Sequence, residues 1–153
     1  YFIPLHGSEG TEVEIAGKRL IMIGSNNYLG LTHHPKVREA AQQAIRQYGT
    51  SCSGSRFLNG TLELHEELER RLAKFMGQEA ALCFSTGFQT NLGVISSIAG
   101  KNDIILCDRE NHASIIDGCR LSFADVRKFR HNDIGELELL LQRGQEQKRA
   151  MLI

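Results

Sequence analysis

Short apolar runs and amphipathic segments alternate regularly after residue 79, and this pattern limits the folds open to the chain. The runs have the composition of β-strands, and they are AALCF (80–84), DIILC (103–107), DVRKF (125–129) and AMLI (150–153). Helical patterns fill the gaps at about 88–99, 113–122 and 133–148. An alternation of strands and helices predicts a parallel sheet with helices on its faces, so we expect an α/β fold.

The chain before residue 80 predicts a different, more local organisation. The stretch EVEIAGKRLIMIGS predicts a β-hairpin that turns at Ala16-Gly17-Lys18. Apolar residues at helical spacing predict one helix that starts at Pro35 and stops at Gly49, and a second that runs from Thr61 to Gly77.

Composition excludes several classes of function. The 18 basic and 18 acidic residues cancel, and no block of like charge indicates a nucleic-acid partner. The apolar runs are far shorter than the roughly 20 residues of a membrane span, so we expect no integral membrane segment. The 4 cysteines are widely spaced without a CxxC pair, which favours neither a zinc site nor a disulfide framework and fits a reducing cytoplasm.

The segment FSTGFQTN (84–91) is a candidate phosphate site. It lies where an expected strand ends and a helix begins, and ligands of open α/β sheets bind at such junctions. Ser85 and Thr86 offer hydroxyl groups, and Gly87 allows the backbone to approach an anion closely. From composition alone, a plain helix N-cap is the commoner explanation. The segment is neither a P-loop nor a GxGxxG fingerprint, so ATP and NAD are not indicated.

A second polar segment follows the next expected strand. CDRENHAS (107–114) places Asp108 and His112 at the same edge of the sheet as the candidate phosphate site. A histidine there could stack on a flat cofactor or transfer a proton, and a surface or capping histidine explains the pattern equally well.

Seven motifs in one order give the chain a resemblance to the α-oxoamine synthase family of pyridoxal-phosphate enzymes. They are SNNYLGL (25–31), HHP (33–35), YGTSCSGSRFLNGT (48–61), HEELERRLAKFMG (65–77), FSTGFQTN (84–91), DRENHASIIDGCRLS (108–122) and FRHND (129–133). The resemblance implies fold-type I architecture like that of aspartate aminotransferase, pyridoxal 5'-phosphate as cofactor, and a homodimer with active sites at the subunit interface. Residues 1–34 would then form an N-terminal segment with the hairpin, and 35–153 the first part of the cofactor-binding large domain.

The resemblance assigns roles to particular residues. Thr86, Gly87 and Phe88 match the family's cofactor-phosphate turn, and His112 matches the histidine that stacks on the pyridine ring and orients the substrate. The remaining candidates are substrate-binding residues: Asn26, near the substrate carboxylate, and Ser55 and Arg56, close to the active site. A turn-capping role for Asn26 and a structural ion pair for Arg56 remain open alternatives.

The sequence also departs from the family's pattern. Ser51, Cys52 and Ser53 stand where the family has more glycine. The family's imine-forming lysine, its pyridine-binding aspartate and a further histidine would lie beyond residue 153, so we expect a piece of a longer enzyme that is inactive and aggregation-prone alone.

The resemblance implies condensation of an amino acid with an acyl-CoA and loss of carbon dioxide. The motifs favour L-serine with a long-chain acyl-CoA, narrowly ahead of alanine with a pimeloyl thioester, while glycine with acetyl-CoA is a further alternative. A non-catalytic partner subunit without the lysine, and an α/β binding domain in which 85–88 merely caps a helix, are the alternatives from other classes.

Overall fold

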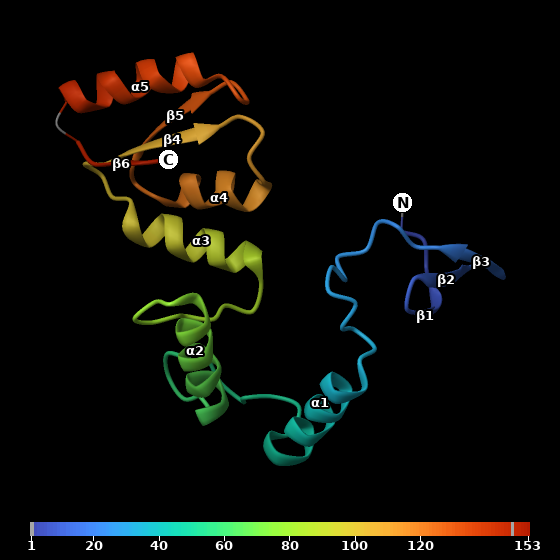
Figure 1. The fold of residues 1–153 in the computed structure, drawn as a ribbon. Helices are drawn as coiled ribbons and strands as arrows, with labels where there is room; N and C mark the ends of the chain where they lie inside the picture. The colour runs from blue at the N-terminus through green and yellow to red at the C-terminus, as the bar shows by residue number, and fades with distance from the viewer. Residues whose placement is uncertain (1, 148) are drawn as a thin grey trace. The chain divides into compact units, whose positions relative to one another are not determined.

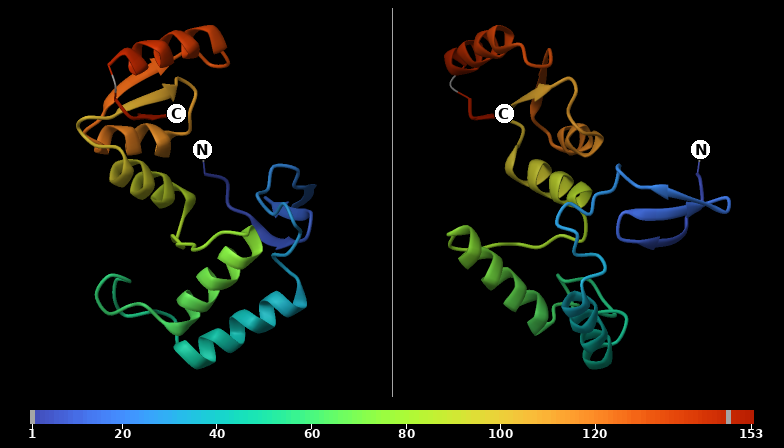
Figure 2. Two further views of the ribbon diagram at one scale, coloured as in Figure 1. Left: turned by 60° about the vertical axis from the view of Figure 1, so that its left-hand side comes forward. Right: turned by 45° about the vertical axis from the view of Figure 1, so that its right-hand side comes forward.

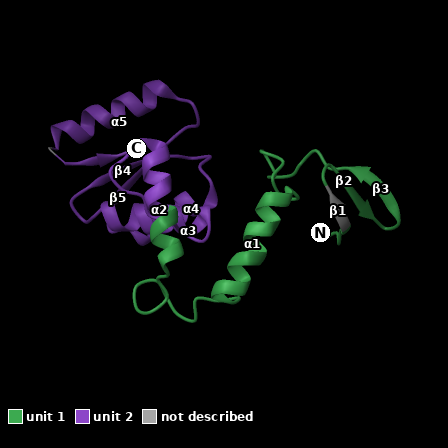
Figure 3. Ribbon diagram, turned by 60° about the horizontal axis from the view of Figure 1, so that its bottom comes forward, with its two compact units in different colours: residues 1–68 green, residues 69–153 purple. Residues whose placement is uncertain are grey.

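The computed structural model describes residues 2–147 and 149–153. The chain divides into two compact units, residues 1–68 (unit 1) and 69–153 (unit 2), which Figure 3 shows in different colours. Each unit is described by itself.

Unit 1 begins with a three-stranded antiparallel sheet in the order β1-β2-β3. The strands are β1 (His6–Glu9), β2 (Glu12–Ile15) and β3 (Lys18–Ile21), and Val13 lies opposite Leu20. Ala16 and Gly17 both have positive φ angles, 49° and 75°, which is the geometry of the tight turns that favour hairpins. The predicted hairpin is therefore confirmed, and β1 extends it by one strand.

Two helices follow the sheet, and both agree with the sequence pattern. Helix α1 (Pro35–Tyr48) starts with Pro35 at its first turn and ends before Gly49, whose φ of 77° an L-residue adopts with difficulty. Helix α2 (Glu63–Met76) ends before Gly77, at φ 64°. Both expected glycine stops are thus confirmed.

Unit 2 contains a parallel three-stranded sheet in the order β5-β4-β6. Its strands are β4 (Ile104–Asp108), β5 (Asp125–Phe129) and β6 (Met151–Leu152). Three helices, α3 (Gly87–Ile98), α4 (Ala113–Leu121) and α5 (Ile134–Glu146), belong to the same unit. The expected parallel sheet with alternating helices is confirmed.

The central strand β4 is buried on both faces, which makes unit 2 a three-layer structure. Ile105 and Cys107 pack with residues of α3 and α4, such as Ile95 and Cys119. Ile104 and Leu106 point to the other face and pack with Leu137, Leu140 and Leu141 of α5. Figures 1 and 2 show α5 over one face of the sheet and α3 and α4 over the opposite face.

The prediction of a strand over 80–84 is wrong. These residues form no strand, and the backbone N–H of Cys83 donates to the Glu69 carboxylate at 2.8 Å instead of to a neighbouring strand. A β-prone sequence becomes a strand only where another strand accepts its backbone hydrogen bonds. Both sides of β4 are already occupied, by β5 and β6.

Candidate functional site

The N-terminus of α3 carries the residues that the sequence assigned to a phosphate. Thr86 is the N-cap, with extended backbone, and its Oγ1 accepts a hydrogen bond from the Gln89 N–H at 3.1 Å. The hydroxyl of Thr90, one turn further on, donates to the Thr86 carbonyl at 3.0 Å. Thr86 therefore caps the helix. The N–H groups of Gly87 and Phe88, in the first turn, have no acceptor within the helix.

The space around this helix end suits an anion. A Cβ placed on Gly87 would meet nothing within 4 Å, and the first turn of α3 contains no acidic residue. The helix dipole adds partial positive charge at the same point, so an anionic group can approach the backbone there.

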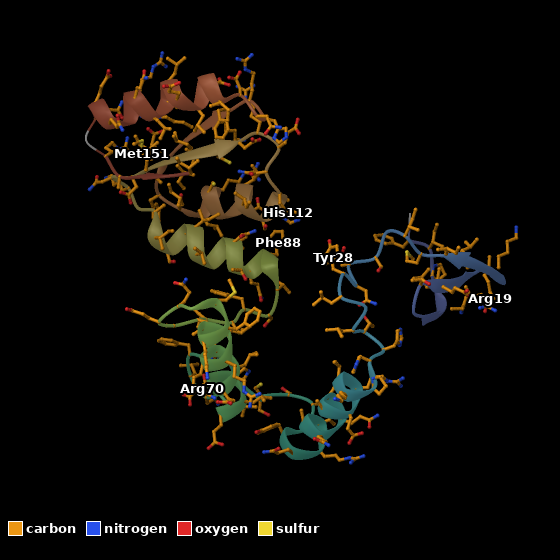
Figure 4. All side chains as sticks on the ribbon, in the orientation of Figure 1. Arg19, Tyr28, Arg70, Phe88, His112 and Met151 are labelled. Carbon is orange, nitrogen blue, oxygen red and sulfur yellow. The ribbon has the colours of Figure 1, made fainter. Side chains whose placement is uncertain are left out.

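His112 lies next to the α3 terminus. It is the N-cap of α4, four residues after the end of β4, and its ring centroid is 6.2 Å from that of Phe88 with an interplanar angle of 75°. Figure 4 shows both side chains, one from the start of α3 and one from the start of α4. The structure thus brings Thr86, Gly87, Phe88 and His112 together.

A hydrogen-bond network fixes the His112 ring from behind. Its Nδ1 accepts the Ser114 N–H at 3.2 Å and lies 2.7 Å from the Ser114 Oγ. The same Oγ accepts a hydrogen bond from the Asn91 amide of α3 at 2.8 Å. Reasoning from the sequence missed Asn91 and Ser114, although Asn91 follows Gly87 by one helical turn and Ser114 is two residues from His112.

A second histidine lies at the same edge of the sheet. His131, just after β5, contacts the Asp108 carboxylate through Nδ1 at 3.1 Å, while the Asn132 amide lies 3.0 Å from its Nε2. The pKa of Asp108 is lowered from its ordinary value of 3.8, chiefly because its carboxylate accepts the Glu110 N–H, with His131 adding to the effect and burial opposing it. Asp108 is therefore a carboxylate at neutral pH.

A cavity of about 320 Å³ lies inside unit 2 near this edge. Apolar residues of α3, α4 and the sheet form most of its wall, and its polar lining residues are Asn91, Asp108 and Asn111. Small-molecule sites combine apolar walls with a few polar groups in this way.

The predicted substrate residue Asn26 belongs to unit 1. It lines a hollow of about 750 Å³ together with Met22, Tyr28 and other residues, and its Oδ1 accepts a hydrogen bond from the Tyr28 hydroxyl at 3.4 Å. The neighbouring Asn27 stabilises the turn instead, since its Oδ1 accepts a hydrogen bond from the Thr32 N–H at 3.3 Å. The Asn26 side chain is exposed and accessible to a ligand.

Ser55 and Arg56 belong to a tightly folded loop of unit 1. The Ser55 carbonyl accepts the N–H groups of Asn59, at 3.2 Å, and Gly60, at 2.8 Å, while the Arg56 carbonyl accepts the Thr61 hydroxyl at 2.7 Å. Gly60 packs against the backbone of this loop so closely that a Cβ there would overlap the Gly54 carbonyl. The loop therefore holds Ser55 exposed and Arg56 half-buried.

The comparisons with known proteins agree with the resemblance seen in the motifs. Residues 18–153 match the family model described as aminotransferase class I and II. The chain is 57% identical to a serine palmitoyltransferase of Sphingobacterium spiritivorum over 143 residues, which is 94% of this chain and 36% of the relative. It is 46% identical to an 8-amino-7-oxononanoate synthase of Geobacter metallireducens over 147 residues, 96% of this chain and 38% of the relative.

A solved structure extends the agreement to the fold. A serine palmitoyltransferase from S. paucimobilis with bound PLP–myriocin aldimine superimposes with a TM-score of 0.89 at 41% identity, covering 93% of this chain and 36% of that one. The expected fold-type I architecture is therefore confirmed.

The chain spans about a third of the length of the relatives it matches. In the part of the chain that the structure describes, no helix is long and apolar enough to cross a membrane.

Proposed function

Because this chain belongs to the class I and II aminotransferase family, we propose that it is part of a pyridoxal-phosphate-dependent acyltransferase. The proposed reaction condenses L-serine with a long-chain acyl-CoA and releases carbon dioxide, as the name of the 57% identical relative suggests. We place the enzyme in the cytoplasm as a homodimer. Residues 35–153 would supply the first part of its cofactor-binding domain, preceded by the 1–34 segment.

The observation that carries the proposal is the open helix end at Thr86–Phe88 beside His112. The N–H groups of Gly87 and Phe88 would hold the cofactor phosphate, together with the Thr86 hydroxyl. The flat face of His112 would lie against the pyridine ring and keep water from it. When bound, pyridoxal phosphate supplies an electron sink for the charge that develops on the α-carbon of the amino acid.

The substrate residues are assigned to unit 1. Asn26, with an exposed amide, would donate to the substrate carboxylate, and Ser55 and Arg56 would contribute further polar contacts. Arg56 can form a bidentate pair with a carboxylate, which favours an amino-acid substrate over a neutral amine.

The experiment uses the full-length protein that contains this chain. Cofactor binding is followed by the visible absorbance of added pyridoxal phosphate, and product formation by mass spectrometry with serine, alanine or glycine and acyl-CoA donors of different length. Serine with a long-chain donor should give the fastest turnover. A preference for alanine with a pimeloyl thioester would replace this proposal by 8-amino-7-oxononanoate synthase activity, which the 46% identical relative supports.

A pair of glycine substitutions tests the phosphate turn directly. Gly87→Ala puts a methyl group into space that is open in the protein, so the fold should be unaffected while the cofactor phosphate is obstructed. We expect binding to weaken by about tenfold or more, which corresponds to about 1.4 kcal/mol. Gly135→Ala is the matched control, because Gly135 also lies in the first turn of a helix, where a Cβ would have only an ordinary contact at 3.6 Å. Equal cofactor affinity in the two variants would refute the assignment.

A further inference from the structure

We propose that Asn91 and Ser114 are positioning residues that fix both the orientation and the tautomer of His112. The inference rests on the proposed function, in which His112 lies against the cofactor ring. In this arrangement the His112 proton resides on Nε2, and the start of α4 is tied to the α3 helix that holds the phosphate.

The tautomer follows from counting donors around Nδ1. The Ser114 backbone N–H, 3.2 Å away, can only donate, so the Nδ1 atom must offer a lone pair. The Ser114 Oγ already accepts from the Asn91 amide at 2.8 Å, which leaves its own proton free to donate to Nδ1 at 2.7 Å. A proton on Nδ1 would face the Ser114 N–H, so the neutral ring carries its proton on Nε2.

The burial of Ser114 restricts the hydrogen-bond partners of its hydroxyl group to Asn91 and His112. Ser114 is 0% exposed, so water cannot replace the partners of its hydroxyl group. The hydroxyl has one proton, and the Asn91 amide decides which way that proton points. Asn91 thus adds, through the Ser114 hydroxyl, to the preference for Nε2–H that the Ser114 backbone N–H already sets, although no contact joins Asn91 to the His112 ring directly in the described structure.

The packing of α3 on α4 brings Asn91 and Ser114 within hydrogen-bonding distance. Gly118, one turn beyond Ser114, lies so close to α3 that a Cβ there would be 2.9 Å from the Asn91 carbonyl oxygen. This approach places the Asn91 amide on the Ser114 hydroxyl. Because Asn91 lies one turn after Gly87 in the same helix, two successive hydrogen bonds, Asn91 to Ser114 and Ser114 to His112, couple the phosphate turn to the stacking histidine.

The chemical consequence concerns the exposed edge of the imidazole. With Nδ1 engaged, Nε2–H remains as a hydrogen-bond donor and suits an acceptor such as a substrate carboxylate oxygen. The opposite tautomer would present a lone pair to the same group and repel it.

The test reads the tautomer of His112 by nitrogen-15 NMR of the labelled full-length protein without cofactor, at a pH where the ring is neutral. Nε2–H should predominate in the unsubstituted protein. Asn91→Asp keeps the size of the side chain but replaces the donor by an acceptor, so the Ser114 hydroxyl turns away from Nδ1. The Ser114 backbone N–H still favours Nε2–H, so the fraction of Nδ1–H should rise measurably while Nε2–H stays the major form. Ser114→Ala should produce a mixture of both forms and weaken cofactor binding by up to about tenfold.

Ser96→Ala is the matched control, since the Ser96 hydroxyl donates only to the Leu92 carbonyl of its own helix, at 2.6 Å. It should leave the tautomer and the cofactor spectrum unchanged. An unaltered Nε2–H signal in both Asn91→Asp and Ser114→Ala would overturn the inference. Failure of the unsubstituted protein to bind pyridoxal phosphate would instead refute the proposed function, because the tautomer is measured without the cofactor.

Discussion

Gly118→Ala offers the sharpest test of how α3 and α4 are packed. A Cβ at this position would lie 2.9 Å from the Asn91 carbonyl oxygen and 3.1 Å from the Ile95 Cβ, both on α3. A backbone carbonyl cannot rotate away as a long side chain can, so the two helices would have to separate by a few tenths of an ångström.

The expected magnitude is the difference between two opposing effects. Alanine in the middle of a helix is favoured over glycine by about 1 kcal/mol. Overpacking of a tight interface costs about 1–3 kcal/mol, and the close contact with backbone places this site in the upper part of that range. We therefore expect Gly118→Ala to lower the free energy of unfolding by about 1–2 kcal/mol.

The assay is urea denaturation of the full-length protein, followed by circular dichroism. Gly135→Ala serves as control, since its Cβ would have an ordinary 3.6 Å contact, and its stability should stay equal or rise by up to about 1 kcal/mol. A Gly118→Ala protein as stable as the Gly135→Ala protein would show that the helices are not in close contact at Gly118.

Three further predictions follow from the core, the helix cap and the charges. Ile104→Ala, at a fully buried position of β4, should destabilise the protein by about 2–5 kcal/mol in the same assay, while Leu139→Ala, at a 55% exposed position, should cost far less. Thr86→Ala removes the N-cap of α3 and should cost about 1 kcal/mol, whereas Thr86→Ser should retain the stability, and a thermal melt of each variant checks this. In the folded protein, the Glu110 N–H lowers the pKa of the Asp108 carboxyl, and Arg127 lowers the pKa of the Asp125 carboxyl. The two carboxylates therefore stabilise the folded state fully above their unfolded pKa of about 4, and this stabilisation is lost as the pH falls through their lower folded pKa values. Asp125→Asn should therefore flatten the pH dependence of unfolding below about pH 5, and an unchanged acid transition would refute the role of its contacts with Arg127 and Arg149.

Local signals predicted most helices and strands because they depend on a few neighbouring residues. The Ala16-Gly17 turn, the Pro35 start of α1 and the Gly77 stop after α2 all follow from backbone preferences that act within one turn. The same reasoning failed at 80–84, since strand formation there requires a partner that lies elsewhere in the chain.

In the candidate site, too, local signals identified some residues, while other features depended on the tertiary structure. Thr86 and Gly87 could be identified from the sequence because a helix N-terminus exposes its N–H groups wherever it forms. The ring-stacking role of His112 was predicted from the order of the motifs. In the structure, the His112 ring lies 6.2 Å from that of Phe88.

Most helix and strand boundaries, and the groups that these elements carry, could be predicted from the sequence, because periodicity and turn residues are properties of adjacent positions. Which of those groups meet depends on the tertiary structure. Asn91 and Ser114 are 23 positions apart and join only because Gly118 lets α3 and α4 approach closely. Contacts of that kind depend on how side chains fill space between helices, and no local pattern encodes them.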